Sequence, residues 1–147
     1  MMTFSILTES LSDSYVYKHP WRSMLTTLGS GVGGGYLGYQ AAKAMNADNP
    51  EVGIPLGVLN GLNTGELASE YIDRKAREYE KDPYKGPRKF GDSVDDYLIR
   101  TGLGNAAGVA LSNYTHVPVG IFAAGRLAGG LGVLAKNKLA QSDSKKK

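Results

Sequence analysis

Four glycines recur at every fourth position in the stretch from Val52 to Ala68. Residues four apart lie on one face of an α-helix, so this spacing predicts a helix with a groove that carries no side chains. Each glycine costs a helix about 1 kcal/mol relative to alanine, and four in register need a compensating interaction. Close approach of a second helix supplies one, as in the small-xxx-small contacts of membrane helices. The predicted groove consists of Gly53, Gly57, Gly61 and Gly65.

Small residues are spaced in the same way before and after this stretch. A turn with proline lies between the two glycine-rich segments of each pair, at 46–51 and at 116–118. This pattern predicts an all-α fold of two glycine-rich helical hairpins joined by a charged helix and loop. The further predicted packing positions are Gly31, Gly35, Gly38, Gly104, Gly108, Gly125 and Gly129. The expected divisions are a leader and anchor (1–22), a first hairpin with a charged helical extension (23–81), a loop (82–91), a second hairpin (92–136) and a frayed basic tail (137–147).

Two helix starts carry capping signals. Asn49 is expected to cap a helix whose first residue is Pro50, and Asp92 or Ser93 is expected to cap the helix that follows the loop. Acidic residues near that second start complement the helix dipole.

Charge is distributed very unevenly along the chain. The 20 residues between Arg22 and Lys43 are uncharged, whereas more than half of all charged residues lie between Glu66 and Arg100. A helix of that uncharged length spans about 30 Å, the thickness of the hydrocarbon core of a bilayer. If four helices cross a membrane, nearly all lysines and arginines fall on one side, as the positive-inside rule expects.

A mean hydropathy of −0.26 and the position of Arg126 argue against four membrane spans. An arginine in the middle of a membrane helix costs about 2.5–3.5 kcal/mol on insertion scales. In a membrane, Arg126 is therefore expected to lie against a partner or line a pore. In a soluble bundle, it is expected to face water, and its replacement is expected to matter little.

The chain lacks the residue constellations of the common catalytic and metal sites. It has no cysteine, and His19 and His116 are far apart in sequence. The glycines at 29–35 lack the Lys-Ser/Thr of a phosphate-binding loop. The basic and aromatic residues at 84–91 have acidic flanks, so no nucleic-acid partner is expected. We therefore expect no catalytic residues, no metal and no cofactor.

Aromatic and basic residues immediately precede the first uncharged stretch. Tyr15, Tyr17, Trp21 and Arg22 have the composition of an anchor at a membrane interface. Trp21 suits the core of a soluble bundle equally well.

Two stretches resemble known protein families. Gly-Gly-Gly-Tyr-Leu-Gly-Tyr-Gln at 33–40 resembles the glycine-zipper helical segments of small bacterial envelope and phage proteins. The N-terminus resembles the leader of internal head proteins of T-even-type tailed phages, although Met2 replaces the usual lysine. That resemblance implies cleavage by a prohead protease after Glu9, so that the mature chain begins at Ser10. The residues that carry it are Met1, Thr3, Phe4, Leu7, Glu9 and Ser10.

Together these features lead us to expect a non-enzymatic glycine-zipper protein that forms homo-oligomers and associates with membrane lipid. Its expected location is the inner membrane of a bacterial host or a virion, from which it would be delivered to the host envelope. One alternative is a soluble structural or scaffold component that packs against other virion proteins through its glycine faces. A further alternative is a holin-like pore former.

Overall fold

The structure is a computed structural model that describes residues 20–79 and 89–144. Within these residues the chain forms α2 (Pro20–Ala44), α3 (Gly53–Tyr79), α4 (Phe90–Thr115) and α5 (Pro118–Ser144). A short 3₁₀ helix, η2 (Pro50–Val52), leads directly into α3. The all-α class predicted from the glycine spacing is confirmed.

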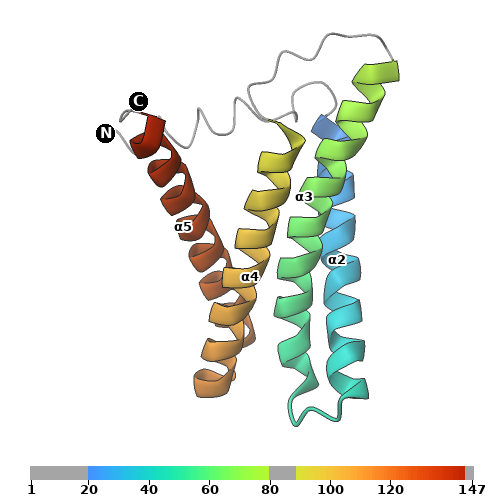
Figure 1. Cartoon of the computed structure of the whole chain (residues 1–147). Coiled ribbons are helices and arrows are strands. Elements are labelled where there is room, and N and C mark those ends of the chain that lie inside the picture. The colour runs from blue at the N-terminus through green and yellow to red at the C-terminus, as the bar shows by residue number, and fades with distance from the viewer. Residues whose placement is uncertain (1–19, 80–88, 145–147) are drawn as a thin grey trace.

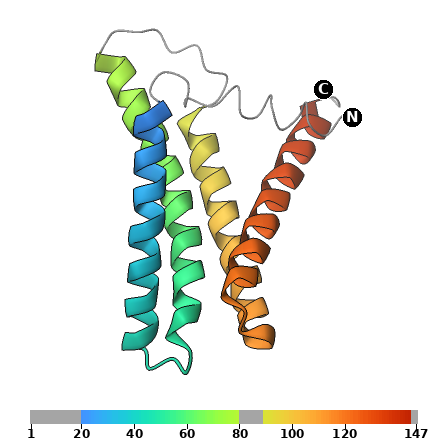
Figure 2. The ribbon, with the colours of Figure 1, turned by 180° about the vertical axis from the view of Figure 1, so that it is seen from behind.

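The four long helices pack as the two predicted hairpins, α2 with α3 and α4 with α5 (Figure 1). Helix α3 also contacts α4 and α5, and it therefore joins the two hairpins. The turns at 45–49 and 116–117 lie at the same end of the molecule, which we call the turn end (Figures 1 and 2). Towards the opposite end, α5 diverges from α4 (Figure 2).

Each hairpin turn contains a residue in the left-handed backbone region, Asn46 (φ 53°) and His116 (φ 52°). After the first turn, the N–H of Val52 donates to the carbonyl of Asn49 at 3.2 Å, which gives a 3₁₀ turn rather than an α-helical one. Asn49 makes no side-chain capping hydrogen bond, and the α-helix begins only at Gly53. Asn49 is thus the N-cap residue of a helix whose first residue is Pro50, as expected, but this helix is the 3₁₀ helix η2 and the Asn49 side chain does not cap it.

The second hairpin differs from expectation at both of its outer ends. Helix α4 begins at Phe90, with Lys89 as its N-cap residue, so Asp92 and Ser93 lie inside the helix rather than at its cap. The Asp92 carboxylate instead accepts a hydrogen bond from the N–H of Lys89 at 3.3 Å. Helix α5 continues to Ser144, through most of the segment predicted as a frayed tail. Residues 137–144 are exposed, so this extension is helical without being packed.

The distribution of polar and apolar side chains is inverted relative to an ordinary soluble bundle. Among the described residues, the buried hydrophobic side chains are Ala42, Leu59, Ile121 and Val133. Large apolar side chains on the outer surfaces are strongly exposed; Val32 is 76% exposed and Leu127 is 68% exposed. The buried polar residues are Ser23, Asn63, Ser69, Asp73, Ser93 and Asp96. Glycine contacts and polar side chains therefore fill much of the interior, and large apolar side chains lie outside.

Candidate functional site

The two helices of the first hairpin meet through their backbones. A Cβ atom built on Gly57 of α3 would lie 3.0 Å from the Cα atom of Gly38 on α2. A Cβ atom on Gly38 would in turn lie 2.9 Å from the Cα atom of Gly57. Side chains at Gly53 and Gly61 would run into the carbonyl oxygens of Gly38 and Ser30. Larger residues at these positions would force the two helices apart.

Two of the predicted α2 positions meet side chains of α3 rather than its backbone. A Cβ atom on Gly31 would meet the end of the Leu62 side chain at 2.7 Å. One on Gly35 would meet the Val58 side chain at 2.8 Å. These neighbours are side-chain atoms that can move, so Gly31 and Gly35 set the helix separation less strictly than Gly38 does.

The α2 residues that meet the backbone of α3 form a row of small residues, Ser30, Gly34 and Gly38. A Cβ atom on Gly34 would lie 2.9 Å from the Cα atom of Gly61. Ser30 ends the row, and a Cβ atom on Gly65 of α3 would come within 2.9 Å of the Ser30 Cβ atom. Gly34 was not among the predicted packing positions. Its signal is present in the sequence, because the four-residue spacing continues from Gly38 through Gly34 to Ser30.

The second hairpin has the same kind of glycine contact between α4 and α5. A Cβ atom on Gly104 would lie 3.0 Å from the carbonyl oxygen of Gly125. One on Gly129 would lie 2.9 Å from the carbonyl oxygen of Arg100. Gly108 is also buried on this face. All four predicted glycines of this hairpin thus lie in the contact region.

Leucines from α3 fill the hollows that these glycines leave. Leu59 is 1% exposed, and its Cδ2 atom lies 2.5 Å from the point that a Cβ atom on Gly125 would occupy. The same methyl group lies 3.1 Å from the corresponding point on Gly104. Leu56 reaches to 2.7 Å from the corresponding point on Gly108. The glycines of the second hairpin therefore accommodate both the partner helix and the first hairpin.

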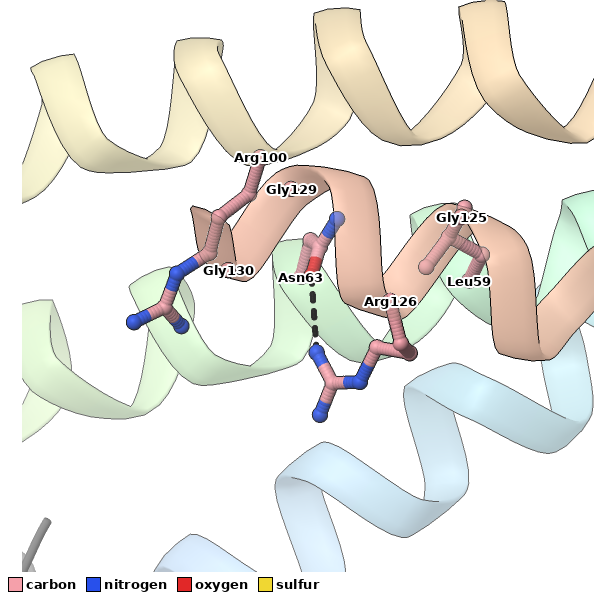
Figure 3. Close-up of a pocket in the computed structure, with 7 residues that line it drawn as sticks. All are labelled: Leu59, Asn63, Arg100, Gly125, Arg126, Gly129 and Gly130. Atoms are coloured by element: carbon pink, nitrogen blue, oxygen red, sulfur yellow. Dashed lines mark hydrogen bonds between the residues drawn. The ribbon is translucent and has the colours of Figure 1, made fainter. Parts of the chain in front are cut away.

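Next to Leu59 the hairpins are joined by charged and polar side chains, which we call the polar junction: Asn63, Glu66, Arg100 and Arg126. Glu66 of α3 accepts hydrogen bonds from Arg100 of α4 at 2.8 Å and from Arg126 of α5 at 3.0 Å. Arg126 also donates to the Oδ1 atom of Asn63 at 3.0 Å (Figure 3). One carboxylate thus holds both helices of the second hairpin against α3.

This geometry corrects the expectation for Arg126 in a soluble bundle. Its side chain is 38% exposed, but it makes two contacts across the hairpin boundary instead of facing water without a partner. The spacing of residues within α5 gives no sign of this contact, because Asn63 and Glu66 lie about sixty residues earlier in the chain.

We expect Arg126→Leu to lower the free energy of unfolding by about 1 kcal/mol, because it removes an ion pair and leaves the buried Asn63 oxygen without its donor. Solvent screening at this half-exposed site keeps the effect moderate. Arg22→Leu, at an exposed arginine of α2, is the control and should change stability by less than about 0.5 kcal/mol. Equal melting temperatures for the two variants, measured by circular dichroism, would contradict a stabilising junction.

Further ion pairs and hydrogen bonds lie on the side of the junction away from the turn end. Ser93 of α4 donates to Glu70 of α3 at 2.7 Å, and Arg74 donates to the same carboxylate oxygen at 2.8 Å. Lys136 of α5 donates to the buried carboxylate of Asp96 at 2.9 Å. The helices therefore meet mainly through glycine near the turn end and through polar groups beyond the junction.

The predicted anchor is described only in part. Trp21 is 73% exposed and Arg22 is exposed, both in the first turn of α2, so Trp21 is not a core residue within the described chain. The other predicted anchor residues and the processing site, Tyr15, Tyr17, Glu9 and Ser10, lie outside the described residues.

Within residues 20–79 and 89–144, no cluster of three or more His, Asp or Glu side chains is placed to hold a metal ion. The fold and its contacts define an all-α double hairpin whose paired helices meet through glycine and whose hairpins meet through a polar junction. No family model matches the chain, no curated protein matches its sequence, and no solved structure matches its fold.

Proposed function

We propose that this protein is a non-enzymatic helix-packing protein that associates with a membrane and oligomerises there. The observation that carries the proposal is the inverted arrangement of side chains, with large apolar groups outside and polar groups inside. In water, extended exposed apolar surfaces mark sites of interaction with other proteins or with membranes. In lipid, the same arrangement has an immediate explanation, since polar groups must find partners within the protein.

Helix α2 carries the clearest apolar surface. Its main packing partners within the described residues are α3 and η2, and the large side chains of its outer face are exposed. Leu25, Val32 and Tyr36 are between 64% and 76% exposed on that outer surface. Because the packed face of α2 consists of small residues, its large side chains are available to lipid or to another chain.

The position of the charges also supports membrane association. Helix α4 has no charged residue from Thr101 to its end, and α3 has none before Glu66. The halves of α3 and α4 nearest the turn end are therefore uncharged, with Lys43, Asp48 and Glu51 exposed at the first turn itself. The opposite end holds the ion pairs of Glu70 and Asp96. Trp21 and Arg22 lie at this charged end, where an interface anchor is expected.

The pairing of Arg126 weakens the main objection to membrane association. An isolated arginine in lipid is costly, whereas one paired with a carboxylate on a neighbouring helix is the usual arrangement of intramembrane charge. Glu66 and Asn63 supply that pairing. The resemblance of the leader extends the proposal to a protein carried in a phage particle and delivered to the inner membrane of a bacterial host.

A soluble assembly component is the second candidate, favoured by the composition of the helices. Among the described helices, α5 is the one whose length and apolar content suffice for a membrane span, and a core helix of a soluble protein passes the same criterion. In that case, the outer face of α2 packs against other copies or other virion proteins.

Flotation of the full-length protein with phosphatidylglycerol–phosphatidylcholine vesicles tests the proposal. Val32 lies midway along the uncharged part of α2, so Val32→Asp places a charge where lipid contact is expected. We expect this variant to lower the floated fraction by about tenfold, because aspartate is strongly disfavoured at the centre of a membrane helix.

Ala140→Asp is the matched control, since Ala140 is exposed in the polar last part of α5 and should tolerate the same charge. Release of the wild type by carbonate washing, or a monodisperse peak in the absence of detergent, would favour the soluble assembly component instead. Equal flotation of the two variants would count against lipid contact at α2.

A further inference from the structure

A cavity of about 160 Å³ lies at the polar junction between the two hairpins. Glycines form much of its wall on the α5 side, and a Cβ atom on Gly130 would meet no other atom within 4 Å. The space beside Gly130 is therefore open, next to the Arg126 side chain that also lines the cavity. The lining residues, drawn in Figure 3, are Leu59, Asn63, Arg100, Gly125, Arg126, Gly129 and Gly130.

Asn63 brings a buried donor to this cavity. The residue is 3% exposed, and within the described chain its Nδ2 atom has no hydrogen-bond partner. Its Oδ1 atom accepts from Arg126, which can only donate, so this contact fixes which side of the amide carries the nitrogen. Figure 3 shows the nitrogen turned away from the Arg126 guanidinium. A buried amide N–H without a partner is unfavourable, which indicates that an acceptor belongs beside it.

The charge around the cavity specifies the kind of acceptor. Arg100 and Arg126 contribute two positive charges, and Glu66 contributes one negative charge, so the junction has one positive charge in excess. Each guanidinium has five N–H donors, and the contacts with Glu66 and Asn63 leave several of them available. A water molecule would satisfy the Asn63 amide, whereas an anion would satisfy it and also pair with the two guanidinium groups. No carboxylate lines the cavity to attract a cation.

We infer that the cavity binds a phosphate-type oxyanion, which accepts from the Asn63 amide and balances the excess charge of the two arginines. Arginine pairs with phosphate oxygens in strong, directional hydrogen bonds. The oxyanion is either free phosphate or the phosphodiester of a lipid head group. Because a free anion can reach the half-exposed arginines from water, the inference does not rest on membrane association.

Asn63→Asp is the most direct test. It keeps an oxygen for Arg126 and replaces the amide donor by a negatively charged acceptor, with almost no change in size. We expect inorganic phosphate, added at constant ionic strength, to shift the Asn63 side-chain NH₂ signal of the wild type saturably in ¹⁵N NMR spectra. In Asn63→Asp, phosphate binding measured by calorimetry should weaken by about tenfold or more, since a donor is replaced by a repelling charge.

Asn113→Asp is the control, because Asn113 is exposed near the end of α4 and the substitution changes net charge equally. If Asn63→Asp does not fold, the phosphate titration of the Asn63 NH₂ signal in the wild type still tests the inference. Absence of a saturable shift, or a shift equally produced by sodium chloride, would overturn phosphate binding from solution.

Vesicle binding distinguishes the two sources of the oxyanion. If the ligand is a lipid head group, Asn63→Asp should reduce binding to phosphatidylglycerol vesicles but not to phosphate-free digalactosyldiacylglycerol vesicles. If the ligand is free phosphate, the variant should bind both kinds of vesicle as the wild type does, and only the titration should differ. No effect of Asn63→Asp in either experiment would reject the inference, whether or not the protein binds membranes.

Discussion

Gly34→Ala should destabilise the protein by about 3 kcal/mol, although it adds one methyl group to a helix. The new Cβ atom would run into the carbonyl oxygen of Gly57 and lie 2.9 Å from the Cα atom of Gly61. Backbone atoms cannot move out of the way as a side chain can, so α2 and α3 must separate along their whole contact. Thermal or chemical unfolding monitored by circular dichroism measures the loss.

The adjacent residue provides a matched control. Gly33 is on the same helix, and a Cβ atom there would meet nothing within 4 Å. Gly33→Ala should therefore raise stability by up to about 1 kcal/mol, because alanine favours the helix and no contact is lost. Changes in stability of opposite sign at these two neighbouring glycines are expected only if Gly34 faces a partner helix. Similar effects of the two changes would contradict the packing groove.

The hairpins could be predicted because their main signal is local. Glycine at every fourth position marks one face of one helix, and the periodicity of Gly53, Gly57 and Gly61 is visible without knowledge of the partner. A short turn then leaves the neighbouring helix as the natural partner. Helix ends were less predictable, since the start of α4 at Phe90 depends on a hydrogen bond between the Lys89 backbone and Asp92.

The contacts between the hairpins could not be predicted in this way. The four-residue spacing of the groove places Leu59 off the glycine face, but Leu59 is 1% exposed. Arg126 similarly interrupts an apolar stretch in the sequence and pairs with Glu66 in the structure. Both roles depend on how one hairpin lies on the other. No periodicity within a single helix encodes that arrangement.

Leu59→Ala should cost about 3 kcal/mol of stability, because the side chain is buried and fills a hollow between two helices. The glycines around it have no side chains that could move into the space. Leu127→Ala is the control: Leu127 is 68% exposed on α5, so the same truncation should change stability by about 0.5 kcal/mol or less. Comparable losses in the two variants would show that Leu59 does not join the hairpins.

Combining this change with Gly125→Ala tests the contact itself. In the wild type, a Cβ atom on Gly125 would lie 2.5 Å from the Leu59 methyl group, so Gly125→Ala alone should destabilise the protein. In the Leu59→Ala background, that methyl group is absent and the new Cβ enters the vacated space. The double variant should therefore be more stable than the sum of the single effects by about 1 kcal/mol. The recovery of stability is only partial, because the Gly104 carbonyl oxygen remains 2.9 Å from the position of the Cβ atom on residue 125. Additive losses would mean that Leu59 and Gly125 are not in contact, and the arrangement of the two hairpins would have to be revised.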